Sequence, residues 1–295
     1  MKVTKKSGLF FYYFITPLAA LIYVLCCIIS LLPPSEVIIL SGPPGGFFST
    51  TSEKIKSSLN KANIRARIKH VENTKTILTE VNSASSDRPH IGFVAQDISK
   101  DSTEGLFSLG KIATEPLWLF SLKSSEIKSI NDLLGKIIAV GPKDSGVREL
   151  SERILSLHGV NKHNSIFVEA QIVQAQDKLN RNEVDAAFFL LPFTSTVVKE
   201  LALNETFHLI GFKEAEALSH KINFLEKVVV PKGAFSISPR NPKNDVTTVA
   251  VPVSVIAGDH AGIGLSAFVA NILKTEFTEE TCFVQDRTLP TFVYK

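Results

Sequence analysis

The stretch Gly8–Leu32 contains no charged residue, and it constrains this chain more than any other feature of the sequence. At a rise of about 1.5 Å per residue, a helix of this length can cross a hydrocarbon core roughly 30 Å thick. Lys2, Lys5 and Lys6 precede it without an acidic neighbour, and such a basic flank stays on the cytoplasmic side. The pattern therefore predicts a single-pass signal-anchor helix in the inner (cytoplasmic) membrane, with the rest of the chain in the periplasm or extracytoplasmic space.

A cleaved signal peptide is the main alternative to this anchor. Its apolar core usually has about 7–15 residues and ends in small residues of the Ala-x-Ala type. The exit from the stretch, Ile29–Pro34, offers no such site. A lipoprotein at Cys26 or Cys27 is also disfavoured, because the large Leu25 precedes the first cysteine. We therefore expect the segment to stay attached.

The exported part has one cysteine and a balanced charge. Cys282 is the only cysteine beyond the apolar stretch, so no intramolecular disulfide is expected, and we expect a small buried side chain there. Setting the three N-terminal lysines apart from the 32 Lys and Arg leaves 29 basic against 29 acidic residues. A nucleic-acid partner, which calls for a basic surface, is therefore not expected. A small-molecule or protein partner remains open.

Short β-branched runs alternate with amphipathic stretches after residue 35, which predicts an α/β fold with largely parallel sheets. The expected strands are Val37–Leu40, Ile91–Ala95, Leu117–Leu122, Lys136–Val140, Ala186–Leu190 and Val249–Ile256. The expected helices include Thr50–Ala62 and Val147–His158. The length favours two lobes joined by crossing segments near residues 121–128 and 230–249. We expect residues 1–35 to form the tail, anchor and linker, residues 36–122 with 245–295 lobe I, and residues 123–244 lobe II.

Two strand-to-helix loops have the composition of anion-binding sites. In Ser41–Thr50, glycines such as Gly45 and Gly46 let the backbone approach a ligand, and free N–H groups at a helix start attract an anion. In the second loop, Gly141–Arg148, Ser145 can cap the helix and Arg148 can grip a carboxylate. A plain turn would also explain the first loop. An ion pair of Arg148 with Glu149 or Glu152 would explain the arginine.

Polar and aromatic residues beside these loops are further ligand-binding candidates. Gln96 and Asp97 follow a predicted strand, at the sheet edge where ligand-facing side chains gather, although a cap or turn role for Asp97 is equally open. Phe47 and Phe48 end the glycine loop and can contact a ligand or fill the core; we favour the cleft.

Several stretches, in this order, resemble the TAXI solute receptors, which are the extracytoplasmic binding proteins of TRAP (tripartite ATP-independent periplasmic) transporters. They are Ile39–Phe48 (ILSGPPGGFF), Ile91–Asp97 (IGFVAQD), Glu115–Phe120 (EPLWLF), Ile130–Pro142 (INDLLGKIIAVGP), Ser145–Arg148 (SGVR), Val184–Phe189 (VDAAFF) and Thr248–Pro252 (TVAVP).

This resemblance implies a type 2 periplasmic-binding-protein fold that closes on a small carboxylate-bearing ligand, such as glutamate or another organic acid. It implies that Gly45–Phe48, Gln96–Asp97 and Ser145–Arg148, which includes Gly146, line the cleft. Two positions depart from the family pattern. Glu72 stands in a usually glycine-rich turn and opposes an anion there, whereas Asn182 replaces a glycine and tolerates a left-handed backbone.

Other functional classes have weaker support in the sequence. Gly262–Ala267 fits a loose dinucleotide fingerprint but lies too near the C-terminus for a full βαβ unit, so we expect it to open a helix. The histidines lack zinc-ligand spacing, and no acid–base pair or Gly-x-Ser-x-Gly elbow indicates an enzyme. We expect no cofactor and no metal. The sequence thus predicts a membrane-anchored receptor for a small organic anion that serves TRAP permease subunits; a sensing or protein-interaction module with the same fold is the alternative.

Overall fold

The computed structural model describes residues 15–25, 34–42, 47–71, 74–95 and 105–277. Residues 15–25 are helical with exposed side chains. Within the described ranges, no helix combines the length and the apolar character that crossing a membrane requires. The other parts of the expected anchor, residues 8–14 and 26–32, lie outside these ranges, as does Cys282.

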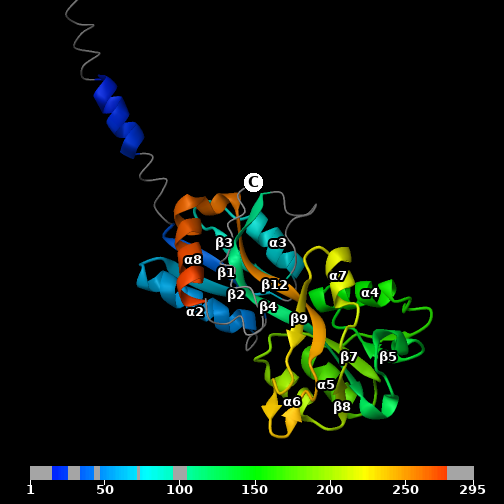
Figure 1. Ribbon diagram of the computed structural model, residues 1–295. Helices are drawn as coiled ribbons and strands as arrows, with labels where there is room; N and C mark the ends of the chain where they lie inside the picture. Colours follow the sequence, from blue (N-terminus) through cyan, green and yellow to red (C-terminus); the bar gives the residue numbers. More distant parts are fainter. Residues whose placement is uncertain (1–14, 26–33, 43–46, 72–73, 96–104, 278–295) are drawn as a thin grey trace, which may run out of the picture.

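The chain forms a mixed α/β structure of two lobes, which are the upper left and lower right halves of Figure 1. The first lobe contains β1 (Glu36–Ser41), α2 (Phe47–Lys61), β2 (Arg65–His70), α3 (Thr74–Asn82), β3 (His90–Val94), η3 (Asp259–Ala261) and α8 (Gly262–Glu276). The second contains η1 (Lys123–Ser125), η2 (Ile130–Leu133), β5 (Ile137–Ala139), α4 (Gly146–Leu157), β6 (Ile166–Val168), α5 (Ile172–Asn180), β7 (Ala186–Leu190), α6 (Thr196–Leu203), β8 (Phe207–Leu209), α7 (Ala215–Lys221), β9 (Glu226–Val230), β10 (Ser236–Ile237) and β11 (Arg240–Asn241).

Two long strands, β4 (Leu106–Leu122) and β12 (Val246–Gly258), run from one lobe into the other (Figure 1). They pair with each other from Ala250↔Pro116 to Gly258↔Leu106. Beyond this ladder, β4 pairs with β7 and β8 of the second lobe, whereas β12 pairs with β3 of the first lobe and with β9. The lobes are therefore joined by hydrogen-bonded strands. The exact lobe boundaries stay a prediction.

The expectation of largely parallel sheets was wrong for the crossing strands. Pairs β1–β2, β1–β3, β5–β6 and β5–β7 are parallel, but β4 and β12 are antiparallel to each of the neighbours given above. The cause is topological, because each crossing strand returns the chain toward the lobe that the other one leaves. A 10-stranded mixed sheet results.

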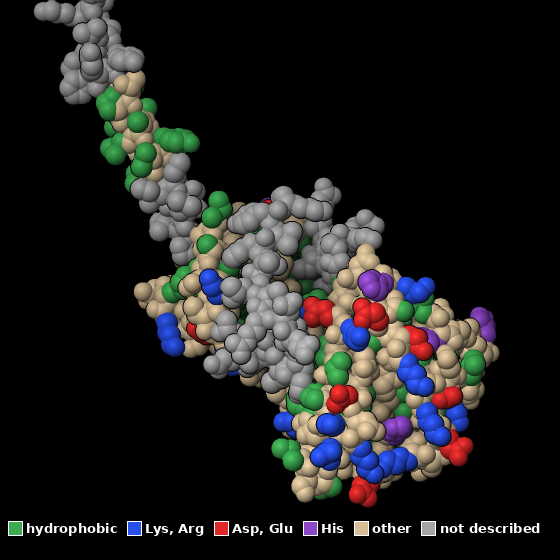
Figure 2. Space-filling model, in the orientation of Figure 1, with side chains coloured by type: hydrophobic (Ala, Val, Ile, Leu, Met, Phe, Trp, Pro, Cys, Tyr) green, Lys and Arg blue, Asp and Glu red, His purple; other side chains and the backbone are tan. Residues whose placement is uncertain are grey.

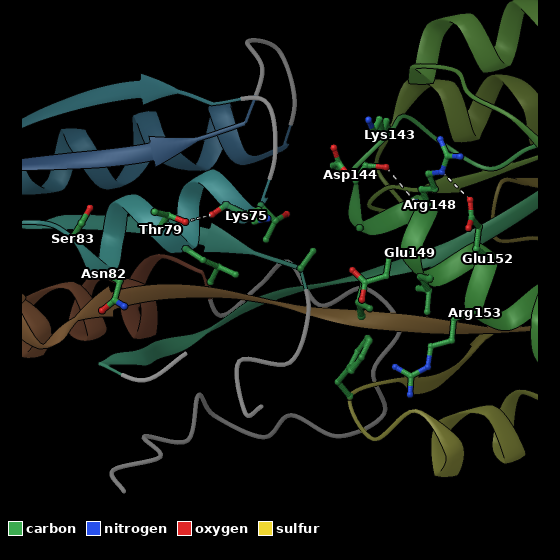
Figure 3. A pocket seen from close by; sticks show the side chains of 18 residues that line it. Lys75, Thr79, Asn82, Ser83, Lys143, Asp144, Arg148, Glu149, Glu152 and Arg153 are labelled. Carbon is green, nitrogen blue, oxygen red and sulfur yellow. Dashed lines mark hydrogen bonds and ion pairs between the residues drawn. The ribbon is translucent and has the colours of Figure 1, made fainter. Parts of the chain in front are cut away.

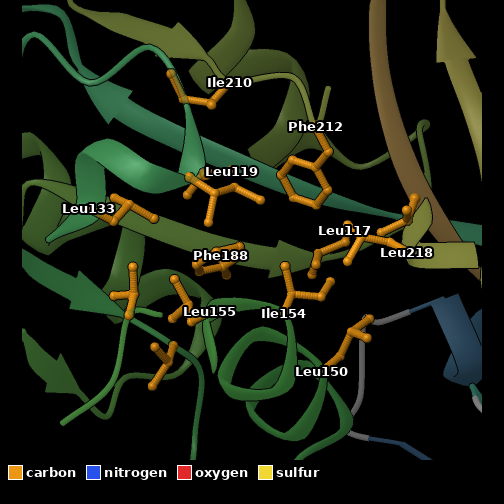
Figure 4. Close-up of a cluster of buried hydrophobic side chains, with 14 of the residues drawn as sticks. Leu117, Leu119, Leu133, Leu150, Ile154, Leu155, Phe188, Ile210, Phe212 and Leu218 are labelled. Carbon is orange, nitrogen blue, oxygen red and sulfur yellow. The ribbon is translucent and has the colours of Figure 1, made fainter. Parts of the chain in front are cut away.

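Each lobe has helices on both faces of its part of the sheet, which explains why the parallel strands read as continuous apolar runs. In the first lobe, α2 and α8 cover one core cluster and α3 covers another. In the second lobe, α4 and α7 pack over the cluster of Figure 4, around Leu119 and Phe188, while α5 and α6 cover the opposite face. The two lobes thus have separate cores on either side of the β4–β12 crossing.

Helix α3 packs directly over Gly92 of β3, where a side chain would not fit. A Cβ atom built on Gly92 would lie 2.4 Å from Cγ2 of Ile77, a separation that real Cβ atoms do not adopt. The glycine therefore sets the depth at which α3 packs on β3. The packing depth of α3 also sets the position of its polar face relative to the second lobe.

Candidate functional site

A cleft of about 1120 Å³ lies between the lobes. Figure 3 shows α3 of the first lobe on one side and the start of α4 on the other. The lining residues are Thr74, Lys75, Leu78, Thr79, Asn82, Ser83, Ala95, Lys143, Asp144, Ser145, Gly146, Arg148, Glu149, Leu150, Glu152, Arg153, Phe224 and Val251. Ligand pockets usually enclose roughly 300–1,000 Å³, so this cleft is large enough for a small molecule.

The loop between β5 and α4 forms one wall of the cleft, and its backbone is built for a sharp turn. Gly141 has a φ of +100°, a conformation that favours glycine, and Asp144 has a φ of 57°. Ser145 then caps α4: its Oγ accepts the N–H of Arg148 at 3.3 Å and donates to the carbonyl of Pro142 at 2.6 Å. The predicted cap is confirmed. The N–H groups at the first positions of α4, Gly146 and Val147, have no intrahelical acceptor and can receive an anion.

Arg148 lines the cleft, but its guanidinium already binds two carboxylates. Nε donates to Oε1 of Glu152 at 2.8 Å, and Nη1 donates to Oε2 of Glu169 at 3.0 Å (Figure 3 draws the first contact). Glu152 also pairs with Lys162 at 3.1 Å. Although burial opposes ionisation, these cations hold the pKa of Glu152 below its ordinary value. The ion pair with Glu152 that the sequence left open is therefore present, and Glu169 adds a second one.

The pKa of Glu169 is also low. Its carboxylate accepts the backbone N–H of Lys143 at 2.9 Å and the guanidinium of Arg148, and both stabilise the charged form. The loop and the helix start are thus tied together by one acidic side chain. A ligand that binds Arg148 has to use the remaining N–H donors of the guanidinium, which carries five in total.

Three other cations line the cleft without an ion pair among the described residues: Lys75 on α3, and Lys143 and Arg153 on the second lobe. Asp144 and Glu149 are the acidic lining residues that likewise have no ion pair there. In Figure 3, Lys75 faces the cleft from one wall, and Lys143, Asp144 and Glu149 face it from the other. These five lining residues together therefore carry a net charge of +1.

Away from the cleft, charges of both signs are interspersed. On the face of the second lobe seen in Figure 2, Lys and Arg side chains alternate with Asp and Glu. Such mixing produces no single-sign field over that face.

Helix α3 presents its first turn and one polar stripe to the cleft. Thr74 and Lys75 start the helix, and Thr79, Asn82 and Ser83 follow at helical spacing on the same side. The opposite side, Ile77 and Val81, is buried against the sheet. Two helix starts from different lobes therefore border one cavity.

Several predicted ligand contacts lie outside the described residues, namely Gly45, Gly46, Gln96 and Asp97, and so does Glu72. The carbonyl of Gly42, just before the glycine loop, accepts a hydrogen bond of 2.6 Å from Nδ1 of His70. The described end of this loop is therefore held against β2.

Phe47 and Phe48 are not among the lining residues of the cleft. Both pack against the core of the first lobe, and the ring of Phe48 stacks on Phe93 with centroids 5.5 Å apart. Their described contacts are thus core contacts, and a ligand contact by either ring stays a prediction. Ser145, Gly146 and Arg148 do line the cleft, and their binding role also stays a prediction.

The floor of the cleft is apolar. Ala95 and Val251 line it, and Ala95 packs against the cores of both lobes. Beside Val251, in the neighbouring strand, stands Glu115, which is only 6% exposed. Burial raises the pKa of Glu115 to about 8, and burial is the only cause.

A metal centre finds no support within the described ranges. No group of three or more His, Cys, Asp or Glu residues there can hold a metal ion. The sequence of Gly262–Ala267 opens helix α8, as expected, and Asn182 has the expected left-handed backbone with a φ of 56°.

The two-lobed fold is that of periplasmic substrate-binding proteins, as solved structures of low sequence identity indicate. The alkanesulfonate-binding protein SsuA from Xanthomonas axonopodis pv. citri, bound to MOPS, is 16% identical, with a TM-score of 0.50 over 82% of this chain and 73% of SsuA. A structure from work on glutathione import via GshT and the cystine ABC importer TcyBC of Streptococcus mutans is 17% identical, with a TM-score of 0.50 over 81% of this chain and 88% of the other. A full-length BenM mutant is 13% identical, with a TM-score of 0.53 over 98% of this chain and 81% of BenM.

The family follows from the sequence itself. Residues 70–261 match the NMT1-like family. The chain therefore belongs to the NMT1-like family.

Sequence reasoning missed the cations Lys75, Lys143 and Arg153. No local motif distinguishes them from solvated surface residues. The polar stripe of α3, at positions 75, 79 and 82, was the available signal, but only the fold shows that this stripe faces a cleft.

Proposed function

We propose that this protein is an extracytoplasmic solute-binding protein that captures a small organic anion, a glutamate-like amino acid or another carboxylate, between its two lobes. The observation that carries the proposal is the pair of helix starts, α3 and α4, that border one cleft from opposite lobes. The resemblance to TAXI receptors extends it to a TRAP-type transporter. The protein binds and does not catalyse.

The physical basis is the combination of the N–H groups at the start of α4 and the lining cations that have no ion pair among the described residues. The macrodipole of a helix favours an anion at its N-terminus by roughly 0.3–1 kcal/mol. Lys75 and Lys143 add charge from the two walls. Closure would move lobe I (residues 36–122 with 245–295) against lobe II (residues 123–244) about β4 and β12. The exclusion of water strengthens each of these contacts.

A ligand screen tests the binding function. We expect dicarboxylates and amino acids, tested by thermal shift and then by calorimetry, to include ligands that raise the melting temperature. Lys75→Ala and Lys143→Ala each remove one charge-assisted contact and should weaken binding by about three- to tenfold. Lys56→Ala is the matched control, because Lys56 pairs with Glu53 on α2. A broad panel without a single hit would refute the proposal.

The membrane anchor and the permease partner form the second part of the proposal. The charge-free stretch Gly8–Leu32 and its lysine flank support an anchor that holds the receptor beside TRAP permease subunits. We expect the full chain to stay in the membrane fraction after alkaline carbonate washing and to keep its N-terminal residues. A mature N-terminus near Ser35 would contradict the anchor without affecting the binding function.

A further inference from the structure

Glu115 occupies the point where β4 leaves the first lobe for the second. It pairs in register with Val251 of β12, and directly opposite residues of an antiparallel pair project their side chains to the same face. Since Val251 lines the cleft, Glu115 lies one cross-strand step, about 5 Å, from the cleft floor.

The neighbours of Glu115 on this face belong to different cores. Ala113 is part of the core of the first lobe, and Leu117 is part of the core of the second. Ala95, which packs against both cores, lines the cleft as Val251 does. Glu115 is therefore a buried acidic residue at the junction between the two lobe cores.

The carboxyl of Glu115 makes no hydrogen bond or ion pair with any residue that the structure describes. The residue is 94% buried, but its oxygens are not among the fully enclosed unpartnered atoms there, which are Oγ of Ser41, Oγ1 of Thr114 and Oγ of Ser121. Burial is the only cause that raises its pKa, so no charged group among the described residues compensates for it. A buried polar group without a partner is costly, and such groups concentrate at binding sites. A neutral carboxyl can both donate and accept a hydrogen bond.

We propose that Glu115 determines ligand specificity: as the lobes close, its carboxyl meets a hydrogen-bond donor of the bound anion. The inference rests on the proposed function and narrows its ligand class. The ligand then carries a hydroxyl or ammonium group beside its anionic group, and a plain carboxylate leaves Glu115 without a partner.

Three probes on one four-carbon skeleton test this inference: succinate has no donor, malate has a hydroxyl and aspartate has an ammonium group. Calorimetry on the full chain should give at least tenfold tighter binding of malate or aspartate than of succinate. Glu115→Leu should reduce this ratio to within about twofold. Ser121→Ala is the control, because Ser121 is fully buried in the same strand, has an unpartnered Oγ and lies six residues further along, outside the cleft lining; it should leave the ratio unchanged.

The outcomes separate the inference from the function. Equal affinity for the three probes, or an unchanged ratio in Glu115→Leu, overturns the role of Glu115 while anion binding stands. Failure of every anion in a broad panel overturns both. Where Glu115→Leu does not fold, Glu115→Gln decides: its amide keeps a hydroxyl partner but cannot take a negative charge. If malate is the preferred probe, its affinity for Glu115→Gln should stay within about threefold of the wild-type value. If aspartate is preferred, its affinity should fall by at least tenfold. A Glu115→Gln variant that shows neither of these two results overturns the inference.

Discussion

The buried carboxyl of Glu115 makes the stability of the protein depend on pH in a calculable way. Its pKa is about 8 in the folded chain, against an ordinary value of 4.5 for the unfolded one. Between these values the folded state holds a proton that the unfolded state has released. The free energy of unfolding therefore falls as pH rises from 4.5 toward 8, and the lost contribution does not return above that range.

The size of the effect follows from the shift. Each pKa unit corresponds to about 1.36 kcal/mol, so this shift is worth roughly 5 kcal/mol above pH 8 and about 3 kcal/mol at pH 7. Both are upper bounds, since water that enters near the junction would lower the cost of the charge. Glu115→Gln removes the titrating group and keeps the shape of the side chain.

We expect urea denaturation at a series of pH values to show this difference. Glu115→Gln should match the wild type near pH 5 and become progressively more stable than the wild type up to pH 8. Ser121→Ala, in the same strand, should follow the wild-type pH dependence. A difference between Glu115→Gln and the wild type that does not vary with pH would refute the reasoning, because it would mean that the carboxyl does not titrate differently in the two states.

The remaining predictions concern the two walls of the cleft. Gly92→Ala puts a methyl group 2.4 Å from Ile77 and should lower the free energy of unfolding by roughly 1–3 kcal/mol in urea, as α3 is pushed off the sheet; full wild-type stability would contradict this packing. Gly146→Ala meets no atom within 4 Å and should cost no stability in the same assay, since alanine is a better helix former; a clear loss would show that the start of α4 tolerates no side chain. Glu169→Gln releases one carboxylate from Arg148 and should tighten anion binding by roughly threefold in calorimetry; weaker binding would mean that Glu169 positions the guanidinium for the ligand.

The strands of the fold were predictable because they are buried on both faces. Ala186–Leu190 matches β7 at both ends, and Val37–Leu40 lies within β1. The length of the crossing strand β4 was underestimated, because only Leu117–Leu122 was expected. Its first half includes Gly110 and Lys111 and does not read as a continuous apolar run. Its register also shifts at two places against β12, which interrupts the period of two.

The candidate site was predictable where chemistry is local and not where it depends on the fold. The cap at Ser145 needs only residues three positions apart. The second partner of Arg148, Glu169, is 21 positions away in sequence and is brought near only by the β5–β6 pairing. Lys75 and Lys143 come from different lobes, so their shared cleft has no signature in any single stretch.

The crossing of β4 and β12 has a mechanical consequence. Since a hydrogen-bonded ladder joins the two crossing strands, bending one strand bends the other, which favours a hinge rotation of the lobes over sliding. The occupancy of the cleft is then converted into one quantity, the angle between the lobes. Any protein that touches the outer ends of both lobes could sense that angle without reaching the ligand.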